Sequence, residues 1–153
     1  MIAGLPFLIV GEAIRIVANG SLIKDKALTD FGIYAHVRHP LYVGSALIAA
    51  GFLVMARSLI LLVVFHVVFI GLYRHTILNE EAKMDRLYGD AFRQWAAATP
   101  RFIPRRLSVR EIRTWFTFRK AWVNREHQGL LGVIALTAVL YLKYLGLFGR
   151  LIG

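Results

Sequence analysis

One long apolar stretch limits the folds open to this chain more than any other feature. Residues Leu41–Tyr73 form a run of 33 residues whose one charged side chain, Arg57, lies in the middle. A helix that crosses a bilayer needs about 20 apolar residues, within a range of about 17–25, so one span cannot use the whole run. Two helices can, if Arg57 and Ser58 form the turn. The sequence therefore predicts a tight helical hairpin made of Leu41–Ala56 and Ser58–Tyr73.

Two further apolar stretches lie near the two ends of the sequence. Met1–Ala18 holds Glu12 and Arg15, which are three residues apart and are expected to pair, although Arg15 could reach a ligand site instead. Its charges follow the apolar residues and no small-residue cleavage site comes after them, so a span is expected and not a signal peptide. His127–Gly149 carries one charge, Lys143, which can reach the nearer membrane surface. The expected fold is an all-α integral membrane protein with about four transmembrane helices.

The positive charges are unevenly distributed along the chain. Twelve of the 19 Lys and Arg residues lie in residues 74–126 and four more in residues 15–38. Because segments rich in Lys and Arg stay in the cytoplasm, both segments are predicted to face it, with Arg57 and both termini outside. Most of the net charge of +10 then orients the spans, and no motif for DNA or RNA binding is present, so no nucleic acid partner is expected. No metal site is expected either, because the chain has no cysteine and its five histidines lack ligand spacing.

Two helices are predicted between the spans. Thr76–Ala98 has no proline and one glycine, which favours a single cytoplasmic helix. Ser108–Trp122 repeats apolar and aromatic residues on one face and basic residues on the other. This pattern predicts one amphipathic helix that lies in the membrane interface, although a packed helix whose charges only set the topology has the same composition.

The first group of residues that could carry chemistry opens the hairpin. Pro40 suits the first position of a helix, which leaves His39 near the N-cap. The free N–H groups of that helix end attract an anion, and Arg38 adds donors at the same place. Gly44 and Gly51 share a helix face, where a neighbouring helix or a flat ligand could come close. The alternative interpretation is structural. Arg38 would anchor the chain at the membrane surface, Pro40 would only start a helix, and the two glycines would only pack against another helix.

The second group closes the hairpin with Arg74, His75, Glu80 and Glu81. Both ends of a hairpin emerge on one side, so these residues are expected to meet Arg38 and His39. The result would be a pocket with an anion-binding half and a cation-binding half, suited to a zwitterionic ligand. Its roof is expected to be aromatic: Tyr88, Phe92 and Trp95. An ordinary solvated face, with the two glutamates near a helix start, is the alternative.

Together, four motifs in this order resemble a known group of enzymes. They are R-H-P-L-Y-V-G at 38–44, E-E at 80–81, Y-G at 88–89 and P-R-F-I-P at 100–104. This combination resembles the membrane methyltransferases of the isoprenylcysteine carboxyl methyltransferase and phospholipid methyltransferase families. G-E-A-I-R at 11–15 resembles the lead-in of the bacterial members. The resemblance covers residues 11–104 of a single expected domain, 1–153, whose remainder, 108–149, lies beyond the family core.

The resemblance implies an activity and a site. The methyl donor would be S-adenosylmethionine, held at the cytoplasmic surface of a membrane, expected to be a bacterial inner membrane. The acceptor would be a lipid-like or prenylated molecule that enters from the bilayer and carries a carboxylate or an amine. The donor-site residues carried over are Arg38, His39, Tyr42, Gly44, Glu80 and Glu81. Arg74 is the expected catalytic residue for orienting a carboxylate, and Glu81 or His75 would take a proton from an amine.

Two other functions remain open. An NADPH-dependent membrane reductase of the sterol type is similar in this hairpin region, but such enzymes usually have Asn where this chain has Leu41 and are normally much longer. A phosphorylated dinucleotide would also require more cationic contacts. A non-catalytic membrane scaffold that keeps the fold is the other alternative. Binding of the methyl donor or of NADPH separates these functions.

Overall fold

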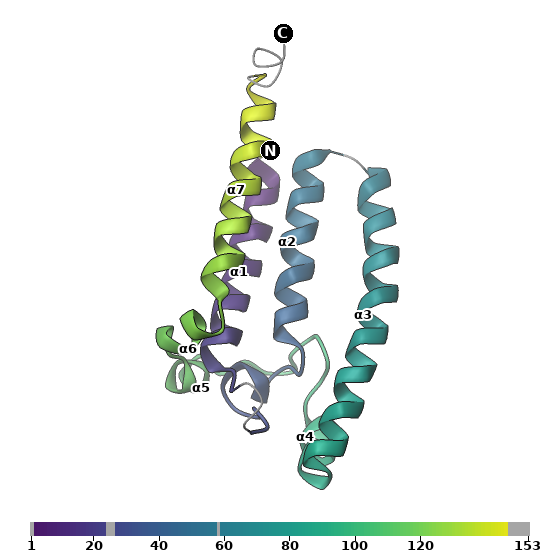
Figure 1. The fold of residues 1–153 in the computed structure, drawn as a ribbon, viewed down its shortest axis with the longest axis vertical. Coiled ribbons are helices and arrows are strands. Elements are labelled where there is room, and N and C mark those ends of the chain that lie inside the picture. The colour runs from purple at the N-terminus through teal and green to yellow at the C-terminus, as the bar shows by residue number, and fades with distance from the viewer. Residues whose placement is uncertain (1, 24–26, 58, 147–153) are drawn as a thin grey trace.

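The computed structural model describes residues 2–23, 27–57 and 59–146, and every regular element within those ranges is helical. The predicted all-α class is therefore confirmed. Four long helices lie side by side in the order α3, α2, α1 and α7 (Figure 1). Their bounds are Leu5–Ser21 for α1, Pro40–Ala56 for α2, Leu59–Tyr88 for α3 and Glu126–Tyr144 for α7.

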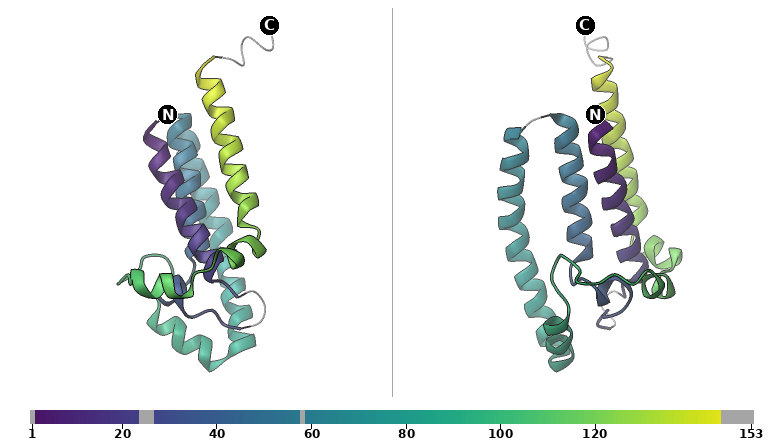
Figure 2. Two further views of the ribbon diagram at one scale, coloured as in Figure 1. Left: turned by 90° about the vertical axis from the view of Figure 1, so that its left-hand side faces the viewer. Right: turned by 180° about the vertical axis from the view of Figure 1, so that it is seen from behind.

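The short elements gather at one end of the long helices. They are α4 (Asp90–Ala98), α5 (Val109–Trp115), α6 (Phe118–Val123) and the 3-10 turn Gly32–Ala35. The N-terminal end of α1, which follows the 3-10 turn Ile2–Gly4, lies at the opposite end, as do the C-terminal ends of α2 and α7 (Figure 2). This is the segregation that the charge distribution predicts, because the basic segments share one end.

The hairpin at the centre of the sequence is present, but its second helix is longer than predicted. Helix α2 ends at Ala56, and its C-cap residue Arg57 adopts the left-handed conformation with φ 53°. The predicted turn residue Ser58 lies outside the described residues. Helix α3 does not end at Tyr73 and continues to Tyr88. One continuous helix therefore joins the apolar segment to the acidic pair, which fixes the direction in which that pair emerges.

Helix length and composition bear on the predicted membrane spans. Within the described ranges, one helical stretch, Ile2–Ser21, is long and apolar enough to cross a membrane, with a mean hydropathy of 1.6. Pro40–Ala56 is apolar but shorter. The described residues therefore do not confirm the count of four spans.

Glycines set the close approach of α1 to α2. A Cβ atom added to Gly44 would lie 2.7 Å from the carbonyl oxygen of Gly11, and one added to Gly51 would lie 2.9 Å from that of Gly4. Small residues let two helix backbones touch in this way, which strengthens van der Waals contact where lipid removes the hydrophobic driving force. The predicted glycine stripe thus receives a neighbouring helix.

Two predicted helices are interrupted in the structure. The helix expected over Thr76–Ala98 breaks at Gly89, whose φ of 53° lies in the region that favours glycine. The helix expected over Ser108–Trp122 breaks into α5 and α6. The reason is a tertiary hydrogen bond, because the extended Thr117 donates its N–H to the carbonyl of Gly20 at 3.0 Å. A continuous helix would have used that donor internally.

The predicted pairing of Glu12 with Arg15 is wrong. Arg15 Nε instead donates to Glu126 Oε1 at 2.8 Å, and its Nη1 donates to Ser45 Oγ at 2.6 Å. The amide of Asn19 donates to the other oxygen of Glu126. This network ties the start of α7 to α1 and α2. The final residues of the span predicted over 127–149 lie outside the described ranges.

Candidate active site

The segment that leads into α2 is held by backbone hydrogen bonds. Pro40 begins α2 and His39 is its N-cap, as predicted. The N–H of Arg38 donates to the carbonyl of Pro100 at 2.9 Å, and the N–H of His39 donates to that of Arg101 at 3.1 Å. The loop after α4 is thereby pinned against the start of the hairpin. This places the side chain of Arg101 beside those of Arg38 and His39.

Glu81 is the centre of the polar cluster. Its Oε1 accepts from Arg38 Nη1 at 2.8 Å and lies 3.0 Å from His39 Nε2, while its Oε2 accepts from Arg101 Nη2 at 2.7 Å. Burial raises the pKa of Glu81, but the hydrogen bonds from Arg101 and His39 and the charges of Arg38 and Arg101 outweigh it and hold the pKa below its usual range. The carboxylate therefore stays ionised at neutral pH.

Glu80 has fewer hydrogen-bond partners than its neighbour Glu81. Its side chain is 42% exposed, and its Oε2 accepts a hydrogen bond from the Tyr42 hydroxyl at 3.0 Å. His39 Nδ1 lies 3.9 Å from the same oxygen. Both glutamates lie in the interior of α3. The alternative that placed them near a helix start, favoured by the dipole, is therefore wrong.

A cavity of about 650 Å³ lies between the starts of α2, α4 and the second half of α3. The polar residues that line it include Tyr34, Arg38, His39, Tyr42, Glu80 and Glu81, together with Thr29 and Lys83. Its aromatic wall is formed by Tyr88, Phe92 and Trp95. The structure brings together at one cavity groups that lie some 40 residues apart in sequence. The anionic and cationic halves of the cavity pair with each other in this structure.

Two donors in the cavity wall are without a partner. The hydroxyl of Tyr34 and the Nε of Arg38 are buried and make no hydrogen bond among the described residues. Trp95 holds this region together, because its Nε1 donates to the carbonyl of Tyr34 at 3.1 Å. Buried polar groups are nearly always satisfied, so two orphan donors in one cavity wall indicate groups that a ligand would engage.

Three residues chosen from the sequence lie elsewhere. Gly44 faces α1, and Arg74 and His75 lie on exposed parts of α3; none of them lines the cavity. Their roles stay predictions from the sequence. The sequence reasoning missed Arg101 and Tyr34 as site residues. Arg101 stands within the recognised P-R-F-I-P motif, but nothing local indicates that its side chain would turn back to α3.

Comparison with known proteins decides the family. Residues 10–91 match the family model for phospholipid methyltransferase, which is more than half of the chain. The chain belongs to the phospholipid methyltransferase family. The family match contains the polar cavity residues from Tyr34 to Glu81, and it ends before Phe92, Trp95 and Arg101.

A relative of this phospholipid methyltransferase family member has a name that states its reaction. The chain is 31% identical over 94 residues to the protein-S-isoprenylcysteine O-methyltransferase of Schizosaccharomyces pombe (strain 972 / ATCC 24843). The match covers 61% of this chain but 40% of the relative, so the chain spans less than half of that protein's length. No solved structure matches the chain. The family match and this relative confirm the resemblance that was drawn from the four motifs.

Proposed function

We propose that this protein transfers a methyl group from S-adenosylmethionine to a lipid-like acceptor at the cytoplasmic surface of a membrane. The observation that carries the proposal is the meeting of Arg38 and His39 with Glu80 and Glu81 at one cavity, inside the segment that matches the methyltransferase family. The cavity volume of about 650 Å³ falls within the usual range for small-molecule sites, about 300–1,000 Å³.

The residues of the cavity fit the charges of this donor. Glu80 has free acceptor capacity and would take the ammonium group or the ribose hydroxyls. The orphan donors of Tyr34 and Arg38 would hold the carboxylate. Glu81 is already engaged by three partners and keeps Arg38 and His39 in position. S-adenosylmethionine supplies a methyl group that is electrophilic because it is bound to a sulfonium.

The charge state of Glu81 bears on the acceptor. A carboxylate whose pKa is held low is a weak base, so it is poorly suited to take a proton from an amine. A carboxylate acceptor needs no base, because it is a nucleophile at neutral pH. The residues would then act by alignment and by exclusion of water, for which the aromatic wall of Tyr88, Phe92 and Trp95 is suited. We therefore propose a carboxylate on a lipid-like or prenylated molecule as the acceptor.

The charges and the fold support a membrane orientation for this proposal. We propose that α1, α2, the apolar part of α3 and α7 cross the membrane, with the cavity on the cytoplasmic side of a bacterial inner membrane. The basic segments support this, since they gather at the end that holds the cavity. The exposed aromatic side chains of Trp115, Phe118 and Trp122 on α5 and α6 suit the membrane interface.

Calorimetric titration of the purified protein in detergent tests the proposal. S-adenosylmethionine and its demethylated product should bind saturably, whereas NADPH should not. Glu80→Gln should weaken binding, and Asp90→Asn should not, because Asp90 is exposed on α4 outside the cavity. Binding of NADPH without binding of the methyl donor would replace the proposal with a reductase. Binding of neither would favour the scaffold.

A further inference from the structure

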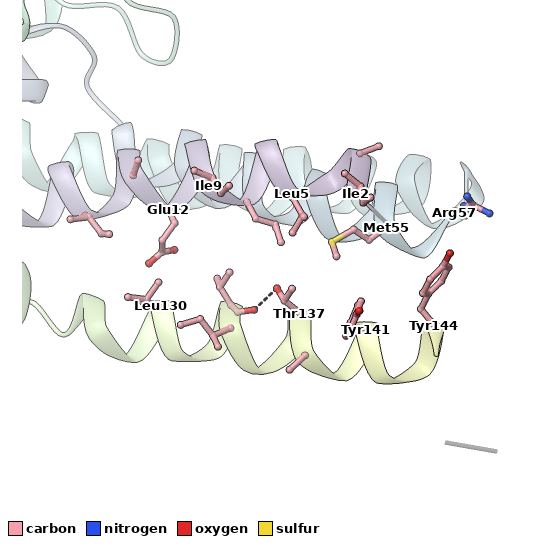
Figure 3. A pocket seen from close by; sticks show the side chains of 17 residues that line it. Ile2, Leu5, Ile9, Glu12, Met55, Arg57, Leu130, Thr137, Tyr141 and Tyr144 are labelled. Atoms are coloured by element: carbon pink, nitrogen blue, oxygen red, sulfur yellow. Dashed lines mark hydrogen bonds between the residues drawn. The ribbon is translucent and has the colours of Figure 1, made fainter. Parts of the chain in front are cut away.

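A second cavity lies between α1 and α7, away from the candidate active site. It is a groove of about 1150 Å³ whose walls are mostly apolar side chains of these two helices (Figure 3). Leu5 and Ile9 line it from α1, and Leu130 and Ile134 line it from α7. None of the described residues that line the groove also lines the active-site cavity. The groove is therefore a separate site.

Glu12 is the feature that apolar packing does not explain. It is 5% exposed, both of its carboxylate oxygens are buried without a hydrogen-bond partner among the described residues, and its side chain points into the groove toward α7 (Figure 3). The cation that could serve it, Arg15, is bound to Glu126 at 2.8 Å and to Ser45. The guanidinium of Arg15 is therefore engaged by Glu126, and the carboxylate of Glu12 has no hydrogen-bonding cation among the described residues. A buried carboxylate without a donor is unfavourable, so the groove lacks a positively charged, hydrogen-bonding group.

We propose that this groove binds a single-chain amphiphile with an ammonium head. The ammonium donates to Glu12, and the apolar chain lies along the walls formed by α1 and α7. This occupant supplies what the site lacks, because an ammonium brings both a positive charge and three donors. A helix from a second copy would cover the apolar walls but leave Glu12 unpaired. A fatty acid would place a second negative charge beside it.

Photolabelling in lipid nanodiscs tests the site. The probe is a long-chain primary amine with a diazirine in its tail, added to phosphatidylcholine discs that hold the full chain, and labelled peptides are located by mass spectrometry. Label should concentrate on α1 and α7 and be displaced by dodecylamine but not by dodecanol or laurate. Glu12→Gln keeps the shape and should lower the labelling of these helices about tenfold, which corresponds to loss of about 1.4 kcal/mol of binding.

Two alanines of α7 provide a matched pair of variants. Ala138 lines the groove, so Ala138→Leu should fill it and also lower the labelling, with the charge of Glu12 intact. Ala135 is exposed on the same helix and does not line the groove, so Ala135→Leu should label as the wild type does. Equal labelling of all lipid-facing helices in every variant would overturn the proposal, as would competition by dodecanol equal to that by dodecylamine. The readout involves no methyl transfer, so its failure is distinct from failure of the proposed activity.

Discussion

Replacement of Glu81 by glutamine removes the charge that three side chains share while keeping the shape of the residue. Arg38, whose side chain is 14% exposed, would lose its anionic partner. Removal of one partner from a buried ion pair costs about 3–5 kcal/mol. The cluster lines a cavity, so it is not fully buried. The side chain of Arg101 is 46% exposed, so its ion pair with Glu81 adds little to the stability of the fold. We therefore expect Glu81→Gln to lower the free energy of unfolding by roughly 2–3 kcal/mol, below the range for a fully buried pair.

This loss is measurable as a fall in the melting temperature of the protein in detergent, followed by circular dichroism. Each kcal/mol shifts the midpoint by about 2–4 °C in a chain of this size, so a fall of roughly 4–12 °C is expected. Glu80→Gln is the matched control, because it removes the same charge from an adjacent residue whose side chain, among the described residues, accepts a hydrogen bond from Tyr42 alone. Its cost should stay within about 0.5–1.5 kcal/mol.

For donor affinity the order of the two variants should reverse. Glu81→Gln is expected to lose more stability, whereas Glu80→Gln is expected to lose more affinity for S-adenosylmethionine. Loss of a hydrogen bond to a charged group, about 1.5–3 kcal/mol, predicts that Glu80→Gln weakens binding of S-adenosylmethionine by roughly 10- to 150-fold with the fold intact. A Glu81→Gln protein that melts like the wild type would refute the reading of Glu81 as the centre of the cluster. A Glu80→Gln protein with wild-type affinity would refute the assignment of the donor to Glu80.

Three further predictions concern stability. The pKa of Glu81 lies below its ordinary value of 4.5, so its stabilising contribution is complete above that pH and is lost as the pH falls through the folded-state pKa; the difference in melting temperature between wild type and Glu81→Gln should shrink in acid. Gly44→Val should cost about 1–3 kcal/mol in thermal unfolding, because its Cβ would meet backbone of α1, whereas Gly132→Ala meets open space and should cost much less. Glu126→Gln should leave Arg15 without its anionic partner and so increase the rate of limited proteolysis between α6 and α7. An unchanged rate would contradict the role of Glu126 in holding the start of α7 against α1.

The convergence of the polar residues could be predicted from the sequence because the hairpin is a strong constraint. An apolar run with one central charge must turn back, so Arg38 and His39 had to emerge beside Glu80 and Glu81. The contribution of Arg101 could not be predicted in this way. It depends on backbone hydrogen bonds between the loop after α4 and the segment before α2, and no local pattern specifies them.

The partner of Arg15 shows the same limit. Two carboxylates were available to it, one three residues away and the other 111 residues away, and the structure selects the distant one. Local spacing favoured Glu12, but packing of α7 against α1 brings Glu126 within reach. The break at Thr117 has a similar origin, since a carbonyl of α1 takes the N–H that a continuous helix would use. By contrast, the break at Gly89 carries a local signal, because glycine accepts positive φ without strain.

Transfer of a labelled methyl group tests the proposed function most directly. The purified chain is incubated with methyl-labelled S-adenosylmethionine and a total lipid extract, and the labelled product is identified by mass and by its sensitivity to base. We predict a lipid product that gains one methyl group as a base-labile ester, formed by Asp90→Asn at the wild-type rate and by Glu80→Gln far more slowly. Label that stays on the donor although the donor binds, or product formed equally by both variants, would contradict a methyltransferase site at this cavity.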